Sequence, residues 1–247
     1  MMFGRLPHDP GRLAAAPALR NYGLAPAPLT VDRSAIDFTP ELFKNDTLPD
    51  CTAVTLANCV QAASLVLTGA KEVIDPVKVP AFYGASIGKP NATTDELAVT
   101  EGAQILDVLA YQSRAGFDAG QQAALVANFG VIDPTTTAIA SAVAHLGHCY
   151  IGIRLYERDM ATFGVGPWDD DGSDPGALVG LHATFVWSYA KLGDDGLVQI
   201  GTWGNWQPAT WRWVATHTDE AHGLMWNDRA PGINYAALRG DVAGFVA

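Results

Sequence analysis

The sequence predicts an α+β protein with two unlike halves, because helical patterns fill the first part of the chain and strand patterns the second. The 247 residues are 49% hydrophobic and only 17% charged, which is typical of a chain with a large buried core. At roughly 100 to 200 residues per domain, this length allows one large domain or two interlocked halves. We expect an N-terminal arm over 1–45 and one domain over 46–247.

The expected arm is defined by its prolines, which recur without a helical or alternating period. Such a pattern predicts an extended segment that lies over the surface. The prolines concerned are Pro7, Pro10, Pro17, Pro26, Pro28 and Pro40.

The helical half is expected over about 46–146, and its centre is the stretch CTAVTLANCVQAASLVLT at 51–68. Almost every residue of this stretch is small or apolar, which predicts a helix that is buried on nearly every side. Asp50 precedes it and is expected to cap the helix, because a short carboxylate can accept hydrogen bonds from the first free amides.

Two more helices follow in this half, after a loop rich in Pro and Gly over 76–90. The stretch TTDELAVTEGAQILDVLAYQSRAGF predicts a helix that ends before Gly116, since Gly commonly terminates helices. The stretch 135–146 predicts another helix, which Gly147 closes.

The β half is expected over about 147–226. CYIGIRL reads as a strand, and HATFVWSYAKL and LVQIGTW read as a hairpin joined by a Gly-Asp-Asp-Gly turn. The stretch WRWVATHTDEAHGLMW predicts further sheet, and the tail over about 227–247 is weakly patterned.

The charge balance excludes several classes of partner. Fifteen Lys and Arg against 26 Asp and Glu give a net charge of −11, which repels nucleic-acid phosphates and anionic membranes. No uninterrupted apolar run reaches the roughly 18 residues that span a bilayer, and Pro7, Asp9 and Pro10 break the N-terminal stretch where a signal peptide would need an apolar block. We therefore expect a soluble protein.

No metal centre or cofactor is expected. The three cysteines, Cys51, Cys59 and Cys149, are odd in number and widely spaced, which fits neither a disulfide framework nor a metal site. The acidic loop WDDDGSDPG lacks the Gly and Glu positions of a calcium loop, and Gly147 separates His145 from His148. Cys59 and Cys149 are interpreted as core thiols.

One constellation points to nucleophilic catalysis. Cys51 stands at the first turn of the buried helix, where the helix dipole favours thiolate over thiol. His182 opens a strand, from which its imidazole could reach that helix and serve as a base. His217 and His222, which flank Asp219 and Glu220 (THTDEAHG), are an alternative base cluster that we rank lower, because that stretch reads as a solvated edge of the sheet.

The order of these residues resembles that of the papain-like cysteine peptidases. The segments NDTLPDCTAV, LHATFVWSYAK and GTWGNW stand where that family has its Cys helix, its His strand and its Asn-Ser-Trp-Gly turn. The resemblance covers about 40–225. It implies a papain-like fold, with the helix that starts at Cys51 packed against an antiparallel β half.

The resemblance also assigns roles to single residues. Cys51 matches the nucleophile and His182 the general base, while Trp203 matches the indole that shields the His from water. Asn45, six residues before Cys51, matches the Gln that stabilises the oxyanion, and its carboxamide offers the same kind of N–H donor.

Two positions depart from the family pattern. Gly201 stands where the family has the Asn that orients the His, so the ring would need another acceptor, for which Thr202, Asn205 and Gln199 are candidates. Asp50 lies beside the thiol, where a carboxylate raises the thiol pKa and opposes activation.

The detailed form of the sequence resembles little-characterised papain-like proteins of bacteriophages and prophages. The segments that carry this likeness are HDP in the arm, NDTLPDC, TEGAQILDVLAY, TWG and DEAH. The resemblance implies a protein of a phage particle or of the bacterial host cytoplasm.

Two hypotheses of function follow. The first is a papain-like cysteine hydrolase, a peptidase or amidase, that forms an acyl-enzyme on Cys51 and acts on a peptide or protein substrate. The second is a structural or binding protein of a phage particle or tail that keeps the fold without its catalysis, with neighbouring virion proteins as partners. Gly201 and Asp50 favour the second.

Overall fold

The β half is built on one antiparallel sheet with the strand order β1-β6-β2-β3-β4-β5. Its strands are β1 (Asn128–Ile132), β2 (Cys149–Tyr156), β3 (Leu178–Tyr189), β4 (Leu197–Thr202), β5 (Asn205–Thr210) and β6 (Thr218–Met225). The predicted hairpin of β3 and β4 is confirmed, with Phe185 opposite Gly201. On its other side β3 pairs with β2, which sets His182 opposite Ile153.

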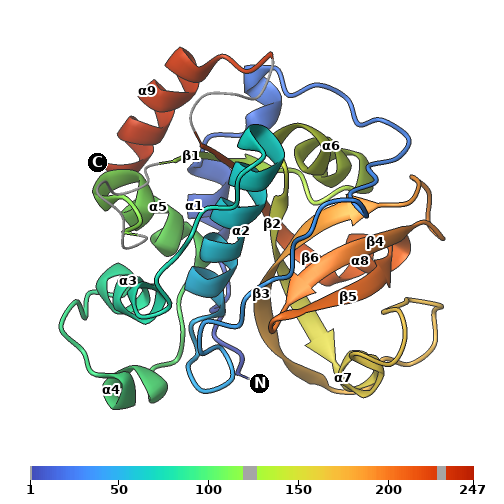
Figure 1. Ribbon diagram of the computed structural model, residues 1–247, viewed down its shortest axis with the longest axis horizontal. Coiled ribbons are helices and arrows are strands. Elements are labelled where there is room, and N and C mark those ends of the chain that lie inside the picture. Colours follow the sequence, from blue (N-terminus) through green and yellow to red (C-terminus); the bar gives the residue numbers. More distant parts are fainter. Residues whose placement is uncertain (1, 119–126, 227–231) are drawn as a thin grey trace.

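The computed structural model describes residues 2–118, 127–226 and 232–247. In Figure 1 the helical half lies on the left, the sheet on the right, and the N-terminal end at the bottom between them. Helices on the left side include α2 (Cys51–Thr68), α3 (Lys78–Ser86), α4 (Thr94–Ala98), α5 (Ile105–Ala115) and α9 (Tyr235–Val246). The other helical segments are α1 (Pro10–Ala15), a short 3-10 turn η1 (Leu19–Tyr22), α6 (Thr136–Leu146), α7 (Glu157–Thr162) and α8 (Trp211–His217).

Helix α2 is the central buried helix expected from the sequence. Every residue from Cys51 to Ala63 is buried, and the helix ends at Gly69 in the left-handed conformation that favours Gly. Among the described residues, α2 alone has the length and hydropathy that could cross a membrane, and 72% of it is buried inside the fold. That burial is typical of the core helix of a soluble protein. The predicted α+β class, with α2 packed against an antiparallel half, is confirmed.

The helical half differs from expectation in two places. Helix α3 forms within the Pro-Gly stretch, because Pro80 occupies its first turn, where no intrahelical donor is needed. The single helix expected before Gly116 is divided into α4 and α5. Between them Gly102 has a φ of 110°, and a side chain there would come within 2.1 Å of the Gly4 carbonyl oxygen. The helix is interrupted at this point, where the N-terminal segment packs against Gly102.

The stretch 211–226 is only partly sheet. Its first residues form α8, whose N-terminus is capped by the Thr210 hydroxyl on the Trp213 amide. The remainder is β6, which lies between β1 and β2 rather than at an edge of the sheet. The expectation of a solvated edge is therefore wrong: Glu220 and His222 are both buried. The weakly patterned tail contains α9.

Arg33 joins the first 45 residues to the sheet half. Its buried guanidinium donates to the carbonyls of Val143 at 2.5 Å and Gly147 at 2.7 Å, at the C-terminal end of α6, and also to that of Trp187 on β3. The guanidinium also lies over the Trp187 ring, 4.6 Å from its centre. Because the C-terminal end of a helix carries partial negative charge, the buried cation stabilises this junction.

We expect Arg33→Ala to lower the free energy of unfolding by about 2 to 4 kcal/mol, since it strands several buried carbonyls. Urea denaturation measures the loss. The matched control is Arg20→Ala, which removes an exposed ion pair with Asp133 and should cost less than about 1 kcal/mol. Equal losses in the two variants would show that Arg33 does not anchor the arm.

Candidate active site

Cys51 begins α2 at the junction of the two halves, where it is 1% exposed. Burial raises the pKa of its thiol to about 12, and the nearby Asp50 carboxyl adds to the rise. Backbone hydrogen bonds from Ala183 and Gly4 and the charge of Arg5 act in the opposite direction. In this closed arrangement desolvation outweighs the helix dipole, so the thiol is neutral.

His182 lies on β3 with its ring held from two sides. Its Nε2 is 2.8 Å from the Thr202 hydroxyl, and Trp203 stacks on the ring at 4.2 Å between centres. Burial lowers the pKa of His182 to about 3, and the positive charge of Arg5 adds to the effect. The other ring nitrogen, Nδ1, is buried without a hydrogen-bond partner.

The turn between β4 and β5 positions both neighbours of the imidazole. Trp203 adopts a φ of 45° and Gly204 one of 72°, so the chain reverses tightly after Thr202. Of the three candidates for orienting His182, Thr202 is the residue that contacts it. Asn205 donates instead to the Trp203 carbonyl at 3.0 Å, and Gln199 is exposed on β4.

One stretch of β3 carries His182 and also contacts the start of α2, where Cys51 lies. The Thr55 hydroxyl of α2 donates to the Ala183 carbonyl at 2.9 Å, and the Ala183 amide bonds to the Cys51 thiol. Ala183 is the direct neighbour of His182. Among the described residues no hydrogen bond joins Cys51 to His182 itself.

Asn45 and Asp50 form a buried pair beside the thiol. The Asn45 amide donates to the Leu48 carbonyl at 3.1 Å and to Asp50 Oδ1 at 3.2 Å, so an oxyanion would have to share these donors. Asp50 does not cap α2 with its side chain, contrary to expectation. Burial raises the pKa of Asp50 to about 8, and its Oδ2 has no partner. A buried neutral carboxyl has replaced the expected cap.

Sequence reasoning missed the N-terminal segment, residues 2–6, which covers this site. The Met2 amide donates to the Asn45 carbonyl at 3.1 Å, and Phe3 contacts His182 and Trp203 edge-on. A side chain at Gly4 would lie 1.9 Å from the Pro49 carbonyl oxygen, so only Gly passes here. A possible signal was a single Arg in the otherwise apolar run FGRL.

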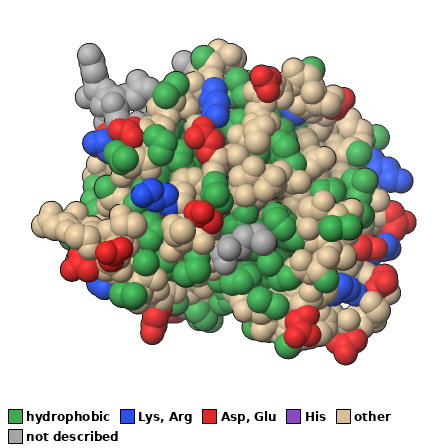
Figure 2. All heavy atoms as spheres, turned by 60° about the horizontal axis from the view of Figure 1, so that its bottom comes forward, with side chains coloured by type: hydrophobic (Ala, Val, Ile, Leu, Met, Phe, Trp, Pro, Cys, Tyr) green, Lys and Arg blue, Asp and Glu red, His purple; other side chains and the backbone are tan. Residues whose placement is uncertain are grey.

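Figure 2 shows the face at the bottom of Figure 1, where hydrophobic side chains gather around the middle. Seven of the large hydrophobic side chains of the described residues are at least 46% exposed, with Val165 and Leu178 among them. Cys51 and His182 are not among the exposed side chains, because both are buried. With residues 2–6 in place, neither side chain is accessible from the solvent.

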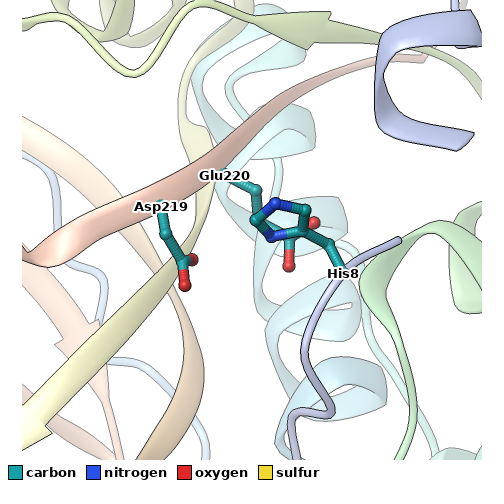
Figure 3. A group of neighbouring side chains, drawn as sticks. All are labelled: His8, Asp219 and Glu220. Carbon is teal, nitrogen blue, oxygen red and sulfur yellow. The ribbon is translucent and has the colours of Figure 1, made fainter. Parts of the chain in front are cut away.

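One cluster of possible metal ligands lies next to this segment. His8, Asp219 and Glu220 each offer an atom within 4.8 Å of the others, and Figure 3 shows the His8 ring turned toward the Glu220 carboxylate. The Arg5 guanidinium already pairs with both carboxylates, at 2.8 Å and 2.6 Å. The cluster is therefore a cation site that a side chain of the same chain occupies.

The chain has a papain-like fold. It is similar to the solved structure of xylellain, a cysteine protease from Xylella fastidiosa, with 12% identity, a TM-score of 0.56 and coverage of 90% of this chain and 91% of that one. The proform of the ragweed pollen cysteine protease Amb a 11 matches with 12% identity and a TM-score of 0.60 over 87% and 72% of the two chains.

A third similar structure is the digestive procathepsin L 3 of Tenebrio molitor larvae, at 13% identity and a TM-score of 0.54 over 89% and 73% of the two chains. No protein-family model and no curated protein sequence matches the chain. At these identities the likeness establishes the arrangement of the backbone. The chemistry has to be argued from the residues themselves.

We expect Asp50→Asn to stabilise the protein more at pH 8 than at pH 4. The folded-state pKa of Asp50 is raised, so the unfolded chain ionises first, and stability is lost as pH rises from about 4 toward 8. The variant removes this loss, and its gain in unfolding free energy should be at least about 2 kcal/mol larger at pH 8.

Urea denaturation at the two pH values checks this result. Asp37→Asn is the matched control, because Asp37 is exposed and is not among the groups that act on Asp50, so this variant should show little change in stability at either pH. A gain for Asp50→Asn that is the same at both pH values would contradict a raised pKa.

Proposed function

We propose that this chain is a papain-like cysteine hydrolase that cleaves a peptide or another amide. One observation carries the proposal: His182, stacked on Trp203 and held by Thr202, keeps an unpartnered Nδ1 at the stretch of β3 that contacts the Cys51 thiol. A nucleophile beside a base that is itself oriented by a third group is the arrangement that nucleophilic catalysis requires.

The reaction follows from these roles. His182 takes the proton of the Cys51 thiol, and the thiolate attacks the substrate carbonyl, whose oxygen becomes an oxyanion. The Cys51 amide and the Asn45 side chain are the donors that this proposal assigns to the oxyanion, and a lost oxyanion donor typically costs roughly 10²-fold in rate. The imidazolium then protonates the leaving amine, and water hydrolyses the acyl-enzyme with His182 again as the base.

This chemistry requires the site to open. With residues 2–6 in place, the pKa values of Cys51 and His182 favour two neutral groups, because neither charge is solvated. When the segment leaves, water reaches both side chains and their charged forms stabilise each other. The active protein would thus be an open form of the one described.

The second candidate is a papain-fold structural or binding protein without catalysis. Two observations favour it: the burial of Cys51 and His182, and the use of the Asn45 donors by Leu48 and Asp50. A role in a phage particle, with virion proteins as partners, stays a prediction from sequence resemblance, and neighbouring virion genes would support it.

Alkylation by iodoacetamide between pH 5 and 9, with peptide mapping, separates the two candidates. For a hydrolase we expect Cys51 to be labelled through an open form with an apparent pKa below the roughly 8.5 of a free thiol. His182→Ala should return that pKa to the free-thiol value, while Cys51→Ser abolishes the label. Labelling of Cys51 that is equally slow in the wild type and His182→Ala would favour the structural role.

Thr202 gives a second test, on amide hydrolysis. Thr202→Val keeps the shape of the side chain but removes the hydroxyl that holds His182 Nε2, and we expect a loss of about 10- to 100-fold in kcat. Thr202→Ser restores the hydroxyl and should retain most of the activity. Equal rates for the two variants would show that this contact does not orient the base.

A further inference from the structure

The Arg5 side chain lies in a closed pocket between the two halves of the fold. Its guanidinium donates to Glu220 Oε1 at 2.6 Å, to Asp219 Oδ2 at 2.8 Å and to the Ile153 carbonyl at 3.4 Å. The side chains of Arg5 and Glu220 are fully buried, and that of Asp219 is 22% exposed. A segment that covers a site by apolar contact alone would not need this ion pair.

The pocket is built to hold a cation. A side chain at Gly152 would come within 2.7 Å of the guanidinium and of Glu220, so the space depends on that Gly. Glu220 is anchored by His222 Nε2 at 3.1 Å. Without a cation the fully buried Glu220 carboxylate would be left uncompensated, which is strongly unfavourable.

The backbone around Arg5 is extended and forms backbone hydrogen bonds on both sides of Arg5, as a peptide bound in a groove does. The Ala103 amide donates to the Gly4 carbonyl at 2.8 Å, and the Leu6 amide donates to the Ala103 carbonyl at 2.9 Å. Arg5 and Ala103 thus form a parallel β-bridge. One residue earlier, the Gly4 amide bonds to the Cys51 thiol. The residue whose side chain enters the charged pocket, Arg5, therefore directly follows the residue whose amide contacts the Cys51 thiol.

We infer that Asp219 and Glu220 form a recognition pocket for the cationic side chain of an extended peptide bound beside Cys51, and that Arg5 fills this pocket from within the chain. Arg is preferred over Lys, because the two carboxylates match the forked donors of a guanidinium. The statement that the bound peptide is a substrate rests on the proposed function. The existence of the pocket does not depend on that function.

A divalent metal is the competing occupant. His8, Asp219 and Glu220, drawn in Figure 3, each offer a ligand atom within 4.8 Å of the others. The buried Nδ1 of His8 and Oδ1 of Asp219 have no hydrogen-bond partners. These groups also line a cavity of about 270 Å³ beside β6. The guanidinium is favoured because it already meets both carboxylates at hydrogen-bond distance.

The test uses the full chain with Arg5→Ala, which empties the pocket without removing the segment. The probe is Nα-acetyl-arginine methylamide, and its uncharged isostere, Nα-acetyl-citrulline methylamide, is the control. We expect the arginine probe at millimolar concentration to raise the Tm of Arg5→Ala by several degrees. The citrulline probe should leave that Tm unchanged, and the wild type should respond to neither.

Glu220→Gln added to Arg5→Ala should weaken binding of the arginine probe about 10- to 100-fold. If Arg5→Ala does not fold alone, its folded yield after dilution from urea, with either probe present, measures the same preference. Equal effects of the two probes would overturn the pocket. A Tm rise with Zn²⁺ that exceeds the one with arginine and is lost in His8→Ala would assign a metal site instead.

The probes can bind whether or not Cys51 is catalytic. The binding test can therefore contradict the pocket without contradicting the proposed function. The Arg5→Ala variant could bind the arginine probe while Cys51 is labelled equally slowly in the wild type and in His182→Ala. The protein would then be a peptide-binding protein with a pocket for a basic residue. Conversely, Cys51 could be labelled with an apparent pKa below that of a free thiol while the two probes bind Arg5→Ala equally. The protein would then be a hydrolase whose substrate specificity does not come from the Asp219–Glu220 pocket.

Discussion

The start of helix α2 against the backbone of β3 is the contact on which the site depends. Thr55 binds the Ala183 carbonyl and the Cys51 thiol binds the Ala183 amide, so the helix meets the strand beside His182. All residues from Cys51 to Ala63 are buried, which leaves the helix little freedom to shift. A displacement of α2 along β3 would move the Cys51 sulfur relative to the His182 ring. It would also disturb the packing of the core.

The same burial sets the electrostatics. A low dielectric environment disfavours every isolated charge, which explains why the pKa values of Asp50 and the Cys51 thiol are raised and that of His182 is lowered. Arg5 can be charged here because two carboxylates surround it. The segment that carries Arg5 therefore completes the core and covers Cys51 and His182. The contacts that stabilise the fold at this junction also keep these two side chains away from the solvent.

The places of Cys51 and His182 in the fold could be predicted because both residues sit in local patterns. Cys51 opens an apolar helix and His182 lies in a strand, as the structure has them. Their catalytic roles follow from the resemblance to the papain-like family and stay a prediction. Thr202 remained one of several alternatives, because its contact with His182 depends on the left-handed conformation of Trp203. The Asn45 donors could not be assigned either, since their partners depend on how the loop before α2 folds back on itself.

The sequence by itself determined the α+β class, the buried α2 and the hairpin of β3 and β4, because these depend on the local periodicity of apolar residues and on turn residues. Only the tertiary structure decided that Arg5 pairs with Glu220, which is 215 residues away along the chain. It also decided that β6 is an inner strand. Partners so distant in sequence leave no periodic pattern, and their pairing is selected by the cost of burying an uncompensated charge.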